Sequence, residues 1–100
     1  MPETPDAAVT DNTAQSRFDM TVDGRVAFVA YRRETRRIVL LHAEVPLELE
    51  GRGIGSRLVR ATLDAIRPEG LRVVPRCPFI AAFIAKNPAY GAMVDAGDGD

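Results

Sequence analysis

The residues best suited to chemistry begin with a glycine-rich run, Glu50-Gly51-Arg52-Gly53-Ile54-Gly55. The run stands between a predicted strand and a predicted helix, where unpaired backbone N–H groups and the positive end of the helix dipole attract a phosphate. Glycine also removes the Cβ that would block a close approach, and it tolerates a positive φ. The spacing fits neither a dinucleotide fingerprint, whose third glycine would fall at Ser56, nor a P-loop, since no Gly-Lys-Ser/Thr follows. The run therefore predicts either a phosphate site of another kind or a tight turn that only lets helix and sheet pack.

Cys77 is a second candidate, because it directly precedes Pro78 at the start of a predicted helix. The helix dipole and the neighbouring Arg76 favour the thiolate form at such a position. One hypothesis makes the thiol a nucleophile or a proton relay. The other makes it a small buried core residue, which is the commonest fate of a free cysteine. The sequence leaves both hypotheses open.

His42 and Glu44 are the candidates for a general base. They are two residues apart in a predicted strand, so their side chains share one face, and we expect both to look toward the same cleft. A general base works best when its pKa lies near neutrality, which favours His42 over Glu44. The alternative is a surface imidazole and a solvated carboxylate on a half-exposed sheet.

The elements that must position these residues follow from hydrophobic periodicity and turn signals. Alternation before the dipeptide Asp23-Gly24 predicts a β-hairpin, and Glu34-Thr35 turns the chain into a third strand that Pro46 ends. An apolar stripe predicts an amphipathic helix that stops at Pro68. A strand reached through a helix usually lies parallel to the preceding strand. The predicted strands span residues 17–23, 25–33, 36–45 and 71–74, and the predicted helices span residues 54–67 and 79–86, the second with Pro78 as its first residue.

Charge is unevenly distributed along the 100 residues. Residues 1–16 and 95–100 each contain three acidic residues, no basic residue and few large apolar groups, so we expect two flexible tails. The stretch 17–94 then holds all 13 basic residues and a formal charge of +5, which suggests an anionic partner. The arginines at 32, 33, 36 and 37 flank a hairpin turn, and they predict either a solvated tip or a docking patch for an acidic partner.

Several classes of function are disfavoured. No run of 18 apolar residues occurs and the N-terminus is acidic, so we expect a cytoplasmic protein without a membrane partner. One cysteine and one histidine exclude an internal disulfide and most metal sites, so no metal cofactor is expected.

The stretch from Val45 to Gly55 closely resembles the signature of the GCN5-related N-acetyltransferases, in which a strand leads to Arg/Gln-x-x-Gly-x-Gly/Ala. The segments His42-Ala43-Glu44-Val45-Pro46, Pro75-Arg76-Cys77-Pro78-Phe79-Ile80 and Asn87-Pro88-Ala89-Tyr90 narrow the resemblance to a small branch of about this length. The match covers residues 18–94.

The resemblance implies that acetyl-coenzyme A is the co-substrate. It places the coenzyme A pyrophosphate on the backbone amides from Arg52 to Ser56, and the pantetheine arm and acetyl carbonyl along the main chain from Glu44 to Leu47. The implied cofactor-binding residues are Val45, Leu47, Glu50, Gly51, Arg52, Gly53, Ile54, Gly55 and Ser56.

The sequence departs from the family pattern at two positions. Glu50 stands where Arg or Gln is usual, which predicts somewhat weaker cofactor binding with the carboxylate turned away. Ile84 stands where larger relatives carry a Tyr that protonates the departing thiolate, so another group or water must serve.

Together the residues and the resemblance predict an α/β fold with a mixed, mostly antiparallel four-stranded sheet and two main helices, without the usual N-terminal helices. The domain spans residues 17–94. The predicted function is acetyl transfer from acetyl-coenzyme A to an amine, with Cys77, His42 and Glu44 as candidate catalytic residues. Because the covering helices are absent, the open cleft suits a bulky or protein-borne amine. The alternatives are a non-catalytic acyl-coenzyme A-binding or regulatory module and, less favoured because stacking aromatics are few, a nucleic-acid-binding domain.

Overall fold

A five-stranded mixed sheet forms one layer of the computed structural model, which describes residues 8–95. The strands lie in chain order, and the first four are antiparallel to their neighbours while β5 runs parallel to β4. The predicted α/β fold with two main helices is therefore confirmed, but the predicted number of four strands is one too few. The strands are β1 (Thr10–Asn12), β2 (Arg17–Val22), β3 (Arg25–Arg33), β4 (Arg37–Glu44) and β5 (Arg72–Pro75).

The additional strand, β1, corrects the expectation of a flexible tail through residue 16. It pairs antiparallel with β2, and polar side chains hold it in place. Asp11 accepts hydrogen bonds from the Tyr31 hydroxyl at 2.5 Å and from Arg33 at 2.7 Å, while Asn12 donates to Asp19 at 2.9 Å. The low hydrophobicity of residues 1–16 predicted a tail. Polar contacts hold β1 instead, and such contacts leave no apolar pattern in the sequence. The expected tails at residues 1–7 and 96–100 lie outside the described residues.

Asp95, which was assigned to the C-terminal tail, is also held. Its backbone N–H donates to the Val73 carbonyl at 2.9 Å, and its carboxylate pairs with Arg37 at 3.2 Å. Asp95 is therefore held beside β5, although the acidic composition of the C-terminal end predicts a tail.

The hairpin between β2 and β3 forms where the sequence predicts it. Val22 pairs with Arg25, so the loop has two residues, Asp23 with φ 52° and Gly24 with φ 77°. Two consecutive positive φ angles match the twist of the flanking strands, as a type I′ turn requires.

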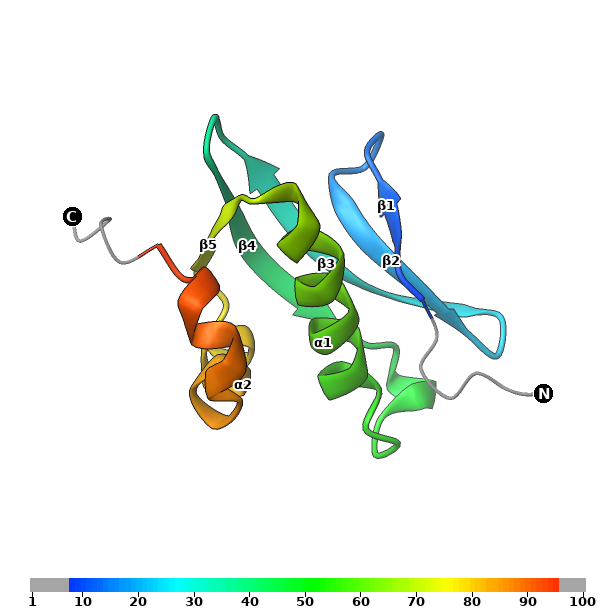
Figure 1. The fold of residues 1–100 in the computed structure, drawn as a ribbon. Helices are drawn as coiled ribbons and strands as arrows, with labels where there is room; N and C mark the ends of the chain where they lie inside the picture. The colour runs from blue at the N-terminus through cyan, green and yellow to red at the C-terminus, as the bar shows by residue number, and fades with distance from the viewer. Residues whose placement is uncertain (1–7, 96–100) are drawn as a thin grey trace.

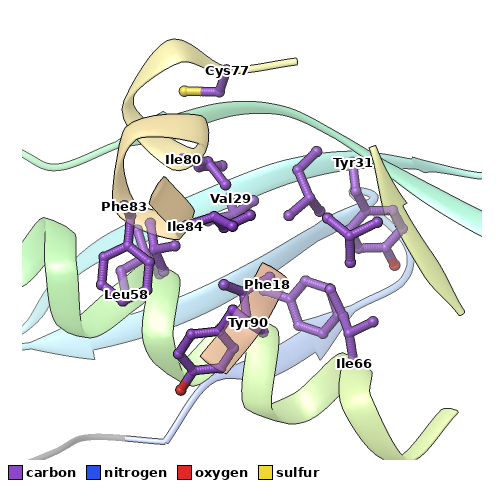
Figure 2. Close-up of a cluster of buried hydrophobic side chains, with 14 of the residues drawn as sticks. Phe18, Val29, Tyr31, Leu58, Ile66, Cys77, Ile80, Phe83, Ile84 and Tyr90 are labelled. Atoms are coloured by element: carbon purple, nitrogen blue, oxygen red, sulfur yellow. The ribbon is translucent and has the colours of Figure 1, made fainter. Parts of the chain in front are cut away.

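Two helices, α1 (Ile54–Ile66) and α2 (Pro78–Lys86), pack on the same face of the sheet (Figure 1). Their buried side chains meet Phe18, Val29 and Tyr31 from the strands in one hydrophobic cluster (Figure 2). Three short 3-10 helices, at Leu47–Leu49, Arg67–Glu69 and Pro88–Met93, connect or follow these elements. At about 25 cal/mol per Å² of apolar surface, this shared core is the main stabilising term of the fold.

On the opposite face of the sheet, the His42 and Glu44 side chains of β4 are 56% and 57% exposed, whereas Val39, which alternates with the core residues Ile38 and Leu40, is 2% exposed. The buried apolar side chains of the described helices all belong to one hydrophobic cluster, which lies on the face of the sheet that α1 and α2 cover. Within residues 8–95, no helix is long and apolar enough to cross a membrane.

Candidate functional site

The glycine run forms a turn anchored at both ends in the core. Leu49 is 1% exposed and Ile54 is 2% exposed, so the chain between them bulges from two fixed points. Gly51 has φ 84° and Gly53 has φ 74°, angles at which a residue with a Cβ costs about 1–2 kcal/mol. These two glycines are therefore required by backbone conformation.

The turn opens the N-terminus of α1. Gly53 is the N-cap residue, no side chain caps the helix, and the first turn contains no acidic residue. The amides of Ile54, Gly55 and Ser56 consequently lack a capping acceptor within the described part of the chain. Uncapped N–H groups at the positive end of a 13-residue helix favour an anion.

A cavity of 430 Å³ lies against this helix N-terminus. Seven of the nine residues predicted to bind the cofactor line it, and the wall is completed by Ala43, Leu49 and Phe79. The seven are Val45, Glu50, Gly51, Gly53, Ile54, Gly55 and Ser56.

The side chains of the other two predicted residues point elsewhere. Leu47 is 78% exposed on the 3-10 helix, and Arg52 reaches across to Asp23 in the β2–β3 turn at 2.8 Å. Only the backbone of Arg52 remains in the turn. Glu50, whose carboxylate we expected to turn away, is a residue of the cavity wall.

Phe79 is a wall residue that sequence reasoning assigned only to the buried face of a helix. The apolar residues Phe79, Ile80, Phe83 and Ile84 predict a largely buried helix. This prediction is wrong for Phe79, which lies in the first turn of α2 and is 48% exposed. A Cβ on Gly55 would lie 3.0 Å from the Cζ atom of the ring. Gly55 therefore allows the aromatic ring of α2 to approach the start of α1.

The far end of β4 has a free edge beside the cavity. Pairing with β5 ends at Leu40 and Pro75, after which the amides of Arg76 and Cys77 both donate to the Leu40 carbonyl, at 3.0 and 3.2 Å. A bulge opposite Ala30 and Tyr31 follows on the other edge. Beyond Leu40, no described strand pairs with β4 on the β5 side, because the chain turns away into α2.

Cys77 is the N-cap residue of α2, as the sequence predicts. Its side chain is 8% exposed, and it lies at the border of the hydrophobic cluster rather than in its middle (Figure 2). It does not line the 430 Å³ cavity, although its backbone contact with Leu40 places it at the point where β4 and β5 separate.

His42 and Glu44 form a pair, with 2.9 Å between Nε2 and Oε1. Their register partners are Ala30 and Phe28, whereas Ala43 pairs with the buried Val29. The two side chains therefore lie on the solvent face of the sheet, opposite the face of Ala43, and they do not line the cavity. The two side chains share one face, as alternation predicts, but this face is opposite the one that lines the cavity, and their role in catalysis stays a prediction.

The arginines at the β3–β4 turn are largely paired with carboxylates. Arg32 and Arg37 bind Glu34, at 3.0 and 2.6 Å, and Arg33 binds Glu69 at 2.9 Å as well as Asp11. The hydrogen bonds from Arg37 and then Arg32 hold the pKa of Glu34 below its ordinary value. Internal pairing weakens the hypothesis of an acidic docking partner at this tip.

A metal centre finds no support in the described residues 8–95, which contain no group of three or more potential ligands among His, Cys, Asp and Glu side chains.

Sequence comparison finds relatives of this chain among vertebrate proteins. Three vertebrate proteins named Protein NATD1 match over 63 residues, or 62% of this chain: the bovine protein is 41% identical, and the human and chicken proteins are each 38% identical. The match spans only 56–57% of these relatives' own length.

The fold has a solved counterpart in the NMR solution structure of a GCN5-like protein from Staphylococcus aureus. The TM-score is 0.67 at 22% sequence identity, with 92% of this chain and 91% of that chain aligned. The family model described as GCN5-related N-acetyl-transferase matches residues 17–94, which include the glycine turn, β4 and both helices. The chain therefore belongs to the GCN5-related N-acetyltransferase family.

Proposed function

We propose that the chain binds acetyl-coenzyme A at the glycine turn and transfers the acetyl group to an amine. One observation supports the proposal. The uncapped N-terminus of α1 follows β4, whose edge on the β5 side is free beyond Leu40. An anion and an extended chain can bind side by side there, and coenzyme A combines the two.

The residues present suit this ligand. The amides from Arg52 to Ser56 would hold the pyrophosphate at the positive end of the α1 dipole. The main chain from Glu44 to Leu47 would pair with the pantetheine arm as an added strand does, with Val45 beneath it in the cavity wall. The acetyl end would then lie near Leu40, where β5 leaves β4.

Direct transfer requires the acceptor to lose a proton. The amine nitrogen attacks the thioester carbonyl, the C–N bond forms, the C–S bond breaks, and the sulfur leaves as a thiolate that takes a proton from a nearby acid or from water. His42 is the candidate base for the ammonium proton, and the 2.9 Å contact with Glu44 orients its imidazole. Because the two side chains are 56% and 57% exposed, a protein-borne amine could reach them. Ile84 is 7% exposed within the core and supplies no proton.

A second route passes through Cys77. Its thiolate would attack the same carbonyl, forming a new thioester at Sγ while the coenzyme A thiolate leaves, and an amine would then take the acetyl group from the cysteine. The position of Cys77 at a helix N-cap beside Leu40 supports this route.

Intact-mass spectrometry after incubation with acetyl-coenzyme A distinguishes the routes. The Cys77 route predicts one acetyl adduct that hydroxylamine removes and that is absent from Cys77→Ala. Acetylation of Lys86, the chain's single lysine, would give an adduct that resists hydroxylamine and persists in that variant. If no labile adduct forms but an amine panel still releases coenzyme A, transfer is direct, and His42→Gln should then lower the rate of that release by about 10²–10⁴-fold.

A non-catalytic acyl-coenzyme A-binding module is the second candidate. It is favoured by the position of His42 and Glu44 on the sheet face opposite the cavity wall and by the apolar Ile84. Tight binding without coenzyme A release on any amine, and without a Cys77 adduct, would establish this candidate instead.

A further inference from the structure

A hollow of 520 Å³ is lined by the segment 67–72, which leads from α1 into β5, and by the 3-10 helix Pro88–Met93. We call it the arginine hollow, after Arg67 and Arg72 in its wall. It shares no wall residue with the 430 Å³ cavity. The glycine turn precedes α1 and the segment 67–72 follows it, so about 20 Å of helix lie between them (Figure 1). The arginine hollow is therefore distinct from the proposed coenzyme A site.

Arg67 and Arg72 have no carboxylate partner among residues 8–95, and no acidic residue lines the hollow. Glu69, the acid between them in the sequence, binds Arg33 instead, at 2.9 Å. The arginines of the β3–β4 turn described above are paired with carboxylates, so their charge is largely balanced. Part of the positive charge of the domain therefore lies unbalanced at the arginine hollow, where it favours an anion.

Main-chain carbonyl groups hold both guanidiniums in place. The acceptors are Ala89 for Arg67, at 3.4 Å, and Ala92 and Val94 for Arg72, at 3.0 and 2.7 Å. The Arg67 guanidinium also lies over the Tyr90 ring, 5.0 Å from its centroid. A carbonyl fixes a guanidinium without cancelling its charge, and a guanidinium has more N–H donors than these contacts use. The two cations are therefore positioned before a ligand arrives, which lowers the entropy cost of binding an anion.

The rest of the wall is small or apolar. Met93 is buried in the hydrophobic cluster, and Leu71 packs against that cluster. The other wall residues, Gly70, Ala89 and Ala92, have no side-chain atom beyond Cβ. The volume lies within the range of about 300–1,000 Å³ that is typical of small-molecule sites. An anion that carries an apolar group therefore suits this wall better than a bare inorganic ion does.

We infer that the arginine hollow is a second ligand site, which binds a small organic phosphate monoester. Arg67 and Arg72 pair with the phosphate, and the apolar part of the ligand lies against Leu71 and Met93. A phosphate monoester carries a charge of about −1.5 to −2 at pH 7, which matches two guanidiniums better than the single charge of a carboxylate does. Guanidinium groups also bind phosphate oxygens through paired N–H donors.

NMR titration of the ¹⁵N-labelled chain with phenyl phosphate tests the inference, because each amide signal reports its own surroundings. Phenyl phosphate should shift the amide signals of Gly70, Ala89 and Ala92, and the dependence of these shifts on concentration gives its affinity. Two matched ligands each lack one feature of this probe. Inorganic phosphate lacks the apolar ring, and benzoate has a carboxylate in place of the phosphate. We expect both to bind the hollow at least about 2-fold more weakly than phenyl phosphate.

Charge-removing variants test the two arginines. Arg67→Gln and Arg72→Gln should each weaken phenyl phosphate binding about 2- to 5-fold, the range expected for a partly exposed ion pair. Arg25→Gln is the matched control, because it removes the same charge from β3 without touching the wall of the hollow, and it should leave the affinity unchanged. Because Arg72→Gln also removes two hydrogen bonds to the segment after α2, Arg72→Lys is measured beside it. Arg72→Lys keeps the charge and should bind phenyl phosphate more tightly than Arg72→Gln does.

Three results would overturn the inference. Unchanged amide signals at Gly70, Ala89 and Ala92 in the unmodified chain would exclude the site. Equal affinities for phenyl phosphate and benzoate would exclude the choice of a phosphate ligand. Equal losses in Arg25→Gln and Arg67→Gln would show an effect of net charge alone. The inference does not rest on the proposed function, since the amide signals of the glycine turn report coenzyme A binding separately.

Discussion

Gly55→Ala tests the close approach of the Phe79 ring in α2 to Gly55 in α1. Gly55 is in the first turn of α1 and has no positive φ, so alanine suits its backbone and, in a helix interior, would stabilise by about 0.5–1 kcal/mol. The new Cβ, however, would lie 3.0 Å from Cζ and 3.3 Å from Cε2 of Phe79. Carbon atoms in contact prefer about 3.5–4.0 Å, so the ring must move by roughly 0.5–1 Å.

The cost of that movement follows from the exposure of the ring. Because Phe79 is 48% exposed, its ring can tilt toward solvent, and an off-rotamer χ angle costs about 0.5–1.5 kcal/mol. The helix gain and the ring cost oppose each other, so Gly55→Ala alone should change the free energy of unfolding by less than about 1 kcal/mol. In a Phe79→Ala background the ring is absent, and the same change should stabilise by about 0.5–1 kcal/mol.

Urea denaturation of the four proteins in this double-mutant cycle measures the difference. A Gly55→Ala effect that is the same in both backgrounds would refute the reasoning, because the ring would then not be the group that excludes a side chain at position 55.

Three further predictions concern stability and affinity. The buried Thr62 hydroxyl has no hydrogen-bond partner among the described residues, so Thr62→Val should raise the free energy of unfolding by about 1 kcal/mol in urea denaturation, and a decrease would reveal a partner. Glu50→Gln removes a negative charge from the cavity wall and should tighten coenzyme A binding about 2- to 5-fold by calorimetry, whereas weaker binding would show that the carboxylate assists the ligand. Burial first, then hydrogen bonding to Asp11 for Tyr31 and to Asp64 for Tyr90, raises both pKa values above the ordinary 10.0. The contribution of these two tyrosines to the free energy of unfolding should therefore be fully present below pH 10.0 and should be lost as pH rises through their folded pKa values. A Tyr31→Phe chain that loses just as much stability over this pH range would contradict the assignment.

The sequence was most informative where local rules determine the structure. Asp23-Gly24 could be assigned to a two-residue turn because few residues tolerate positive φ, and Pro78 could be placed at a helix start because its ring fixes φ. The glycine turn was identified by the same logic together with the family resemblance. These features depend on neighbours in the chain, so no tertiary knowledge was needed.

Features built from distant contacts could not be predicted in this way. β1 is held by hydrogen bonds from Tyr31 and Arg33, which lie 20 and 22 residues further along the chain. The separation of His42 and Glu44 from the cavity depends on which face of β4 the helices cover, and alternation alone does not reveal that choice. The role of Phe79 depends on the approach of α2 to Gly55. From the sequence alone, an apolar residue in a helix predicts only that its side chain is buried.

Calorimetric titration of coenzyme A into Gly53→Glu and Gly70→Glu tests the central claim most directly. Both glycines have φ 74° with open space where a Cβ would lie, so both substitutions carry the same backbone strain. Gly53 is the N-cap of α1 in the glycine turn, whereas Gly70 follows the 3-10 helix at the other end of α1. The account predicts that Gly53→Glu abolishes coenzyme A binding while Gly70→Glu binds as the unmodified chain does. Unchanged affinity in Gly53→Glu would contradict the placement of the ligand at the glycine turn.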